Sequence, residues 1–445
     1  MTEHAEKANC EEKVQRLRVR AERKSAVAHR IEIEVDADRV SQAYEHAYRG
    51  LAKRAQVKGF RPGRVPRPVL ERIYGASLGE EVEQQLVVET LPEALEQVGL
   101  RPVAEPHIHA SVPAVGAIFR YTAEVETKPE VVLKETRGLP AVRPRVEISS
   151  EDVERQLEAV RARHAVFSEE PAQVLAVRGH VLTLDFVGHI EGKPFPGGQG
   201  KDLRVELGSG ELLPGFEEQL IGSIAGTERE IRVTFPEDYS RRELAGREAV
   251  FQTQVKAVQR RELPALDDDF AKDMGEFDSL VQLRERIAAD LRQAREREAE
   301  QVFQRSLGDA LIEHNPVEVP PGLVERALEA RLRRAARRLQ RLVSEQALAE
   351  QVAGWREEWR SEVEREVRLS LLLEAVASQE RIVVEDAELD AHLAKLAGEQ
   401  GVEVAQIEKA YREADMLPSL RAELMEEKAL ALLAGEAKVA AKANT

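Results

Sequence analysis

One loop of this chain reads VKGFRPGRVP over residues 57–66. Glycine permits left-handed backbone and proline cannot continue a helix, so the loop ends the helix-like segment before it and projects Phe60. Seven basic residues lie between positions 53 and 72 and only Glu71 opposes them, although the whole chain has a net charge of −16. A cationic loop with an apolar tip suits a surface that offers phosphates beside a small hydrophobic niche. The alternative is a plain connecting turn with Phe60 folded back onto the core.

Length and composition limit the class of protein. At 445 residues the chain should hold roughly three domains. Charged residues make up 33% and aromatic residues 4%, which favours long solvated helices over compact aromatic cores. The negative net charge argues against general nucleic-acid binding, so any RNA contact would come from a local patch.

The sequence also indicates a compartment. The single cysteine, Cys10, cannot form an intramolecular disulfide, and the first 24 residues lack the apolar core of a signal peptide. No run approaches the ~20 apolar residues that a membrane span needs. We therefore expect a cytoplasmic protein without a membrane partner.

Hydrophobic periodicity predicts mixed structure in the first third of the chain. Residues 27–35 and 119–125 alternate between apolar and polar side chains, which predicts two half-buried strands. Three helices are expected between these strands. The first begins after Asp36, the second covers 69–74 and stops at Gly75, and the third covers 78–99. Ser149 and Ser150 offer N-caps for a further helix.

The pattern changes twice further along. Glycine, proline and short alternating runs characterise residues 178–260, which predicts a small β-rich domain. From Asp267 onward apolar residues recur at threes and fours, which predicts helices. The sequence therefore predicts an α+β multidomain chain. Its parts are a charged N-terminal extension (1–24), an α+β domain (25–132), a connector (133–170), a small β-rich domain (171–262) and a long all-α region (263–445).

Several strings in the β-rich segment occur in a fixed order: DFVG (185–188), KPF (193–195), ELLPGFE (211–217) and FPEDY (235–239). Together they resemble the FKBP-type prolyl isomerases. The resemblance implies a substrate pocket lined by Phe186, Phe195, Leu203, Leu212, Leu213, Phe216, Tyr239 and Phe251. It also implies that the backbone NH of Leu213 hydrogen-bonds the substrate.

The residue types fit prolyl isomerisation. Rotation about an X–Pro bond is opposed by amide resonance, a barrier of about 18–20 kcal/mol, and an apolar pocket can favour the twisted amide without a nucleophile, metal or cofactor. Three features depart from the family's small members, because Pro196 stands where they have an acid, Phe216 where they usually have tryptophan, and no second flap tyrosine follows Tyr239. The alternative is that these aromatic side chains form only the domain core.

Three other groups of residues invite a functional reading. His107 and His109 would share one strand face, but no further ligand accompanies them, so we expect a structural role and no metal. Trp355 and Trp359 are one helical turn apart and either pack in the core or line a client-binding surface. An arginine run favours an exposed helix face with i,i+4 ion pairs over a nucleic-acid patch; it comprises Arg331, Arg333, Arg334, Arg337, Arg338 and Arg341.

The order of the parts resembles the trigger factor family of bacterial chaperones over residues ~25–440. The loop pattern Gly-Phe-Arg-x-Gly-x-x-Pro resembles the family's ribosome-docking signature, and it comprises Gly59, Phe60, Arg61, Pro62, Gly63 and Arg64. No nucleotide-binding motif is found, so we expect an ATP-independent chaperone without a cofactor.

The resemblance implies partners and an architecture. The implied partners are protein and RNA of the large ribosomal subunit near the exit tunnel, and nascent or unfolded polypeptides; a weak homodimer stays open. The helical region would form two arms. Two functions remain in competition: a folding enzyme that the arms deliver to its substrate, and a binding chaperone whose isomerase domain is weak or inactive.

Overall fold

The computed structural model describes residues 17–57, 60, 65–237, 239, 241, 244–275, 277–340 and 342–442. The chain forms two compact units, one of residues 1–144 with 300–445 and one of residues 145–299. The long helix α7 (Leu280–His314) contributes residues to both. Among the described residues, no helix is long and apolar enough to cross a membrane.

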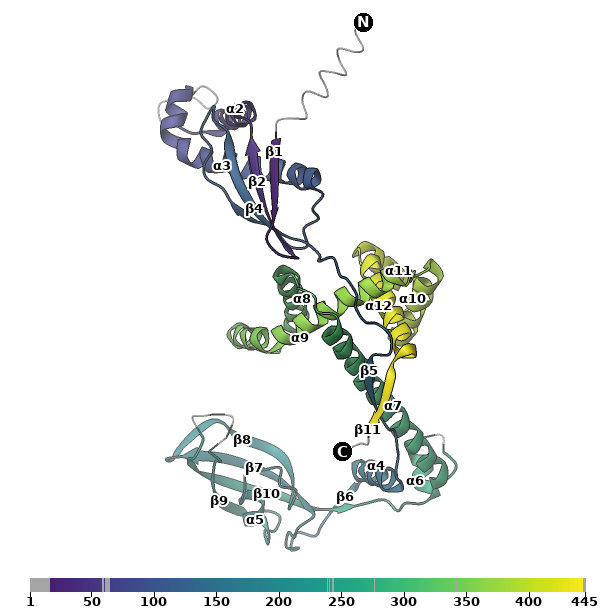
Figure 1. The fold of residues 1–445 in the computed structure, drawn as a ribbon. Coiled ribbons are helices and arrows are strands. Elements are labelled where there is room, and N and C mark those ends of the chain that lie inside the picture. The colour runs from purple at the N-terminus through teal and green to yellow at the C-terminus, as the bar shows by residue number, and fades with distance from the viewer. Residues whose placement is uncertain are drawn as a thin grey trace. The chain divides into compact units, whose positions relative to one another are not determined.

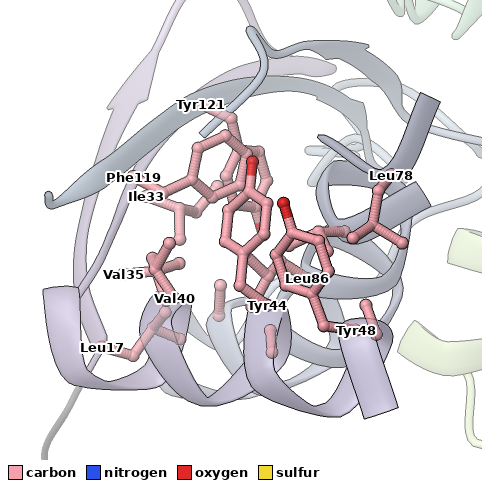
Figure 2. Close-up of a cluster of buried hydrophobic side chains, with 14 of the residues drawn as sticks. Leu17, Ile33, Val35, Val40, Tyr44, Tyr48, Leu78, Leu86, Phe119 and Tyr121 are labelled. Atoms are coloured by element: carbon pink, nitrogen blue, oxygen red, sulfur yellow. The ribbon is translucent and has the colours of Figure 1, made fainter. Parts of the chain in front are cut away.

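The N-terminal part is an antiparallel sheet with two helices packed against it (Figure 1). Alternate residues of the central strands face the helices, so Ile33 lies opposite Tyr121. Figure 2 shows Tyr44 beside Tyr48 and Phe119 beside Tyr121 in this core. The predicted strands and the helix after Asp36 are confirmed. In sheet order the strands are β1 (Leu17–Arg23), β2 (Ala28–Val35), β4 (Phe119–Glu126) and β3 (His107–His109), and the helices are α2 (Ala37–Arg54) and α3 (Arg67–Val98).

Two elements of this part differ from the sequence-based prediction. Strand β1 pairs with β2 along its whole length, so the sheet begins inside the segment expected to be a charged extension. Helix α3 is continuous through Gly75, where the prediction ended a short helix. A glycine in a helix costs about 1 kcal/mol, and the burial of Leu70, Leu78 and Val82 on one face outweighs that cost. The helix ends at Gly99, which has a φ of 67°.

The helical part of the first unit packs around the end of α7. Phe303 and Leu307 of α7 are buried with Leu372 of α9 and Leu433 of α12, and the helical prediction from Asp267 onward is confirmed. The helices are α8 (Pro321–Leu339), α9 (Glu345–Gln379), α10 (Asp386–Gln400), α11 (Val404–Glu413) and α12 (Leu417–Glu436). The strand β11 (Lys438–Lys442) pairs in parallel with β5 (Pro140–Pro144).

The segment that enters this helical part is held by a buried amide. The Oδ1 atom of Asn315 accepts hydrogen bonds from the backbone NH groups of Lys134 (2.7 Å) and Glu135 (3.1 Å). Its Nδ2 atom donates to the carbonyl oxygens of Glu135 (2.8 Å) and Leu311 (2.9 Å). One side chain therefore fixes residues 134–135 against the end of α7.

The second unit is built on a five-stranded antiparallel sheet of order β6-β10-β7-β8, with β9 paired to β10. This confirms the predicted β-rich domain. Its strands are β6 (Val166–Glu169), β7 (His180–Ile190), β8 (Lys193–Glu206), β9 (Glu228–Thr234) and β10 (Glu248–Glu262), and its short helix is α5 (Phe216–Leu220).

A separate helical cluster completes the second unit. Helix α4 (Ser150–Arg163) begins with a capping box at Ser149, as one of the two predicted caps. Its Leu157 is buried against Phe270 of α6 (Asp268–Asp273) and Ile287 of α7. The connector helix thus packs with helices that lie beyond the predicted boundary at residue 263.

Candidate functional site

The β-rich domain contains a pocket of about 420 Å³ that is lined mostly by aromatic and aliphatic residues. The structure brings together all eight side chains that the sequence assigned to one pocket: Phe186, Phe195, Leu203, Leu212, Leu213, Phe216, Tyr239 and Phe251. Four further lining residues were not expected there: Gly197, Phe235, Arg241 and Leu244. Phe235 was recognisable as a strand residue with an inward side chain, whereas the other three carry no local signal.

The aromatic side chains contact one another edge to face. The ring centroid of Phe251 lies 5.3 Å from that of Phe216, 5.8 Å from that of Phe186 and 6.1 Å from that of Phe195. Phe216 and Phe251 are only 4% and 5% exposed and belong to the domain core. These two residues therefore form both the core and the pocket wall, whereas the other six predicted lining residues are partly buried.

Glycines behind the pocket let the rings approach the sheet. A Cβ atom at Gly198 would lie 2.7 Å from Cζ of Phe195, and one at Gly200 would lie 2.4 Å from Cε1 of Phe186. A Cβ at Gly188 would lie 2.6 Å from Cε1 of Phe251. Real Cβ atoms do not approach this closely, so the absence of a side chain at these three positions determines where the rings sit. Pro196 follows Phe195 in β8, and its side chain lies outside the described residues.

A buried carboxylate organises the loop before α5. The oxygens of Glu217 accept hydrogen bonds from the backbone NH groups of Gly208 (2.8 Å), Gly210 (3.1 Å) and Leu212 (3.3 Å) and from Oγ of Ser209 (3.0 Å). Burial by itself raises the pKa of Glu217, but the hydrogen bonds from Gly210, Gly208, Leu212 and Ser209 together outweigh it. The pKa therefore lies below its ordinary value, and the side chain is a carboxylate at neutral pH.

Of the basic loop of residues 57–66, the structure describes Val57, Val65, Pro66 and, between them, Phe60. The side chain of Phe60 is 41% exposed, so it is not folded back onto the core, and its backbone NH donates to the carbonyl oxygen of Val57 at 3.0 Å. The other predicted docking residues, Gly59, Arg61, Pro62, Gly63 and Arg64, lie outside the described residues.

Two of the cations that flank this loop are already paired. Arg54 contacts Glu81 at 2.7 Å and Arg67 contacts Glu71 at 3.0 Å. The guanidinium of Arg67 also lies over the ring of Tyr48. The local excess of positive charge is therefore smaller than the sequence alone suggests.

The remaining candidates lie on the edge strand β3 and on the helices α8 and α9. The side chains of His107 and His109 are exposed on the short edge strand β3. Trp355 and Trp359 stack with ring centroids 4.9 Å apart, and both pack, half-buried, against the apolar face of α8. Arg331 ion-pairs with Glu366, and its guanidinium lies 5.0 Å from the ring centroid of Trp359. Arg331 of the arginine run thus contacts one carboxylate and one tryptophan of the neighbouring helix α9.

The sequence of this chain matches family models and known proteins over most of its length. Residues 17–160 and 279–435 match the N-terminal and C-terminal models described as bacterial trigger factor protein, and residues 173–256 match the FKBP-type peptidyl-prolyl cis-trans isomerases. Trigger factor of Geotalea uraniireducens (strain Rf4) is 36% identical, with 95% of this chain and 98% of the relative covered. Trigger factor of Pelotomaculum thermopropionicum is 38% identical, with 93% of this chain and 96% of the relative covered. A solved structure of the trigger factor chaperone aligns over 94% of this chain and 99% of its own, with 23% identity and a TM-score of 0.47.

Proposed function

This chain belongs to the trigger factor family, and we propose that its isomerase site is the aromatic pocket of the β-rich domain. Membership makes the protein an ATP-independent, ribosome-associated chaperone with an FKBP-type peptidyl-prolyl isomerase domain. The observation that supports the site is the convergence of eight predicted apolar side chains on one pocket.

The chemistry of such a pocket follows from amide resonance. The planar peptide bond before proline is stabilised by resonance that the twisted transition state has lost, which leaves a less polar carbonyl. A pocket that grips the proline ring and excludes water disfavours the planar amide relative to the twisted one. Phe216 and Phe251 form the buried wall for the ring. Within the described part of the chain no acceptor pairs with the backbone NH of Leu213, which leaves this donor for a substrate carbonyl.

An experiment that separates the two activities tests this assignment. The variant Phe195→Ala should slow proline-limited refolding of a client, because it removes one aromatic wall of the pocket. It should still suppress aggregation of a proline-free client as well as the unaltered protein does. Full isomerase activity in a folded Phe195→Ala variant would place the active site elsewhere.

The Phe60 loop is the proposed ribosome-docking element. Phe60 is an exposed aromatic side chain on a loop rich in arginine, and it would enter an apolar niche on a ribosomal protein. Arg61 and Arg64 would contact RNA phosphates or acidic side chains. The domain from residue 25 to residue 132 is accordingly the proposed ribosome-binding domain.

Co-sedimentation with bacterial 70S ribosomes across a salt series tests the docking proposal. The triple variant Phe60→Ala, Arg61→Ala, Arg64→Ala should lose binding, and binding of the unaltered chain should weaken as salt rises. Binding that the triple variant retains would exclude this loop.

A matched control separates docking from general charge. Val88→Ala, Arg30→Ala and Arg101→Ala together remove one exposed apolar side chain and two positive charges from the same domain. This control should sediment like the unaltered protein. Equal losses in both triple variants would mean that net charge, and not the loop, governs binding.

The proposed client-binding surface is the helical region, residues 263–445. Dispersed weak apolar contacts suit a chaperone that releases its client without ATP, because modest affinity goes with fast dissociation. Leu342 and Val343, between α8 and α9, are exposed and apolar. Trp355 and Trp359 are half-buried against α8, so they would support this surface more than they would contact the client.

A further inference from the structure

Glu217 is a buried acidic side chain that the isomerase chemistry does not use. It is 5% exposed, and its two oxygens accept hydrogen bonds from three backbone NH groups and one hydroxyl of the loop 208–212. Within the described residues no lysine, arginine or histidine forms an ion pair with it. All four hydrogen-bond donors to this buried charge therefore belong to the loop.

A buried carboxylate with this set of partners fixes the conformation of the loop and is not expected to add much to the free energy of folding. Burying a charge is costly, and apolar side chains of similar volume often stabilise a fold at least as well as buried charges do. An apolar residue at position 217 would, however, leave the NH groups of Gly208, Gly210 and Leu212 without their acceptor. Only an acceptor at this point can hold all three donors in one geometry.

The loop that Glu217 holds leads directly into the pocket. Leu212 donates its backbone NH to Glu217 at 3.3 Å, and its side chain lines the pocket. Leu213, the next residue, lines the pocket as well and carries the unpaired NH described above. Glu217 and Phe216 are adjacent in α5, so the same helical turn supplies the loop anchor and the buried aromatic wall.

We propose that Glu217 is a positioning residue of the isomerase site. By holding the loop 208–212 it sets the positions at which Leu212 and Leu213 meet a prolyl substrate. Glu217 itself lies behind this loop and acts through it. The inference rests on the proposed location of the active site in this pocket.

The variant Glu217→Gln tests the proposal in the full-length protein. Glutamine keeps the shape of the side chain, but its NH2 group cannot accept the loop donors. We expect kcat/KM for a proline-containing peptide to fall about tenfold or more. Most of the loss should appear in KM, because the loop contacts the bound substrate before the amide twists. The neighbouring exposed Glu218 provides the control, and Glu218→Gln should leave both constants unchanged.

A local readout distinguishes positioning from a general loss of stability. Amide hydrogen exchange of Gly208, Gly210 and Leu212 should quicken in the Glu217→Gln variant while exchange in strand β10 stays slow. Ser209→Ala removes one of the four donors, so it should give a smaller rise in KM. It also provides a milder variant if Glu217→Gln fails to fold.

The outcomes separate this inference from the proposed function. Unchanged kcat/KM in folded Glu217→Gln, with Phe195→Ala inactive, overturns the role of Glu217 and leaves the pocket assignment intact. Full activity in both variants removes the pocket assignment and this inference together. A loss confined to kcat would also contradict the proposal, because it would mean that the loop acts only in the transition state.

Discussion

Replacement of Gly198 by alanine should narrow the proposed isomerase pocket without removing any side chain. The added Cβ atom would lie 2.7, 2.8 and 2.9 Å from Cζ, Cε1 and Cε2 of Phe195. The ring cannot simply retreat, because its centroid is 6.1 Å from that of Phe251 and 6.0 Å from that of Phe235, with both rings edge-on. The backbone at Gly198 has no positive φ, so the effect is steric.

The expected magnitude follows from the cost of overpacking. Extra atoms in a well-packed apolar site typically cost about 1–3 kcal/mol. If the displaced Phe195 ring occupies substrate space, kcat/KM should fall about 5- to 150-fold. A protease-free peptide isomerisation assay measures this value, and a proline-limited refolding assay checks it on a protein client. Suppression of aggregation of a proline-free client should not change.

A second glycine supplies the control for this prediction. A Cβ atom at Gly354, inside helix α9, would meet nothing within 4 Å, so Gly354→Ala should leave isomerisation unchanged. Near-ultraviolet circular dichroism verifies that the domain carrying Gly198→Ala remains folded. Unaltered kcat/KM in the folded variant would refute the reasoning, because it would mean that Phe195 can move without affecting the active site.

Two further predictions concern the helical region. Asn315 is 1% exposed. Asn315→Ala should lower the free energy of unfolding by about 2–4 kcal/mol, because the buried donors and acceptors that it contacts lose their partners. Chemical denaturation measures this loss, and hydrogen exchange should quicken at the amides of Lys134 and Glu135. Burial raises the pKa of Glu426 above its ordinary value of 4.5, although the hydrogen bond from Ser370 opposes the rise. The folded state therefore holds the proton more tightly, and this contribution to stability is present at low pH and lost as the pH rises through the raised pKa. Glu426→Gln should therefore remove part of the pH dependence of thermal unfolding, and it should stabilise the protein at neutral pH because no charge is then buried at this position. An unchanged pH dependence would contradict the raised pKa of Glu426.

Local sequence patterns predicted the strands and helices that have one buried and one exposed face. The alternation in residues 27–35 and 119–125 identified β2 and β4, because strands with one buried face must alternate. The pocket lining was predictable for a different reason. Its residues occur as ordered strings along the chain, so the resemblance to one family assigned them together, and the structure places all eight around one cavity.

The features that the sequence missed depend on distant partners. Strand β1 contains four charged residues among seven, so only its pairing with β2 gives it a place in the sheet. Asn315 fixes backbone about 180 positions away in the sequence, and no local pattern marks it. Glu217 lies close to its loop in sequence, but a glutamate at the start of a short helix ordinarily indicates an exposed position near the helix dipole.

The dual role of the pocket aromatics decides which substitutions can test the mechanism. Phe216 and Phe251 belong to both the core and the pocket wall, so truncating either one changes stability and substrate binding together. Loss of activity in such variants would say little about catalysis. Neither Gly198 nor Glu217 lines the pocket. Gly198 has no side chain and lies against the ring of Phe195, and Glu217 contacts the loop 208–212. Substitutions at these two positions alter where the pocket wall lies while leaving its aromatic surface intact, so they report on the geometry of the site itself.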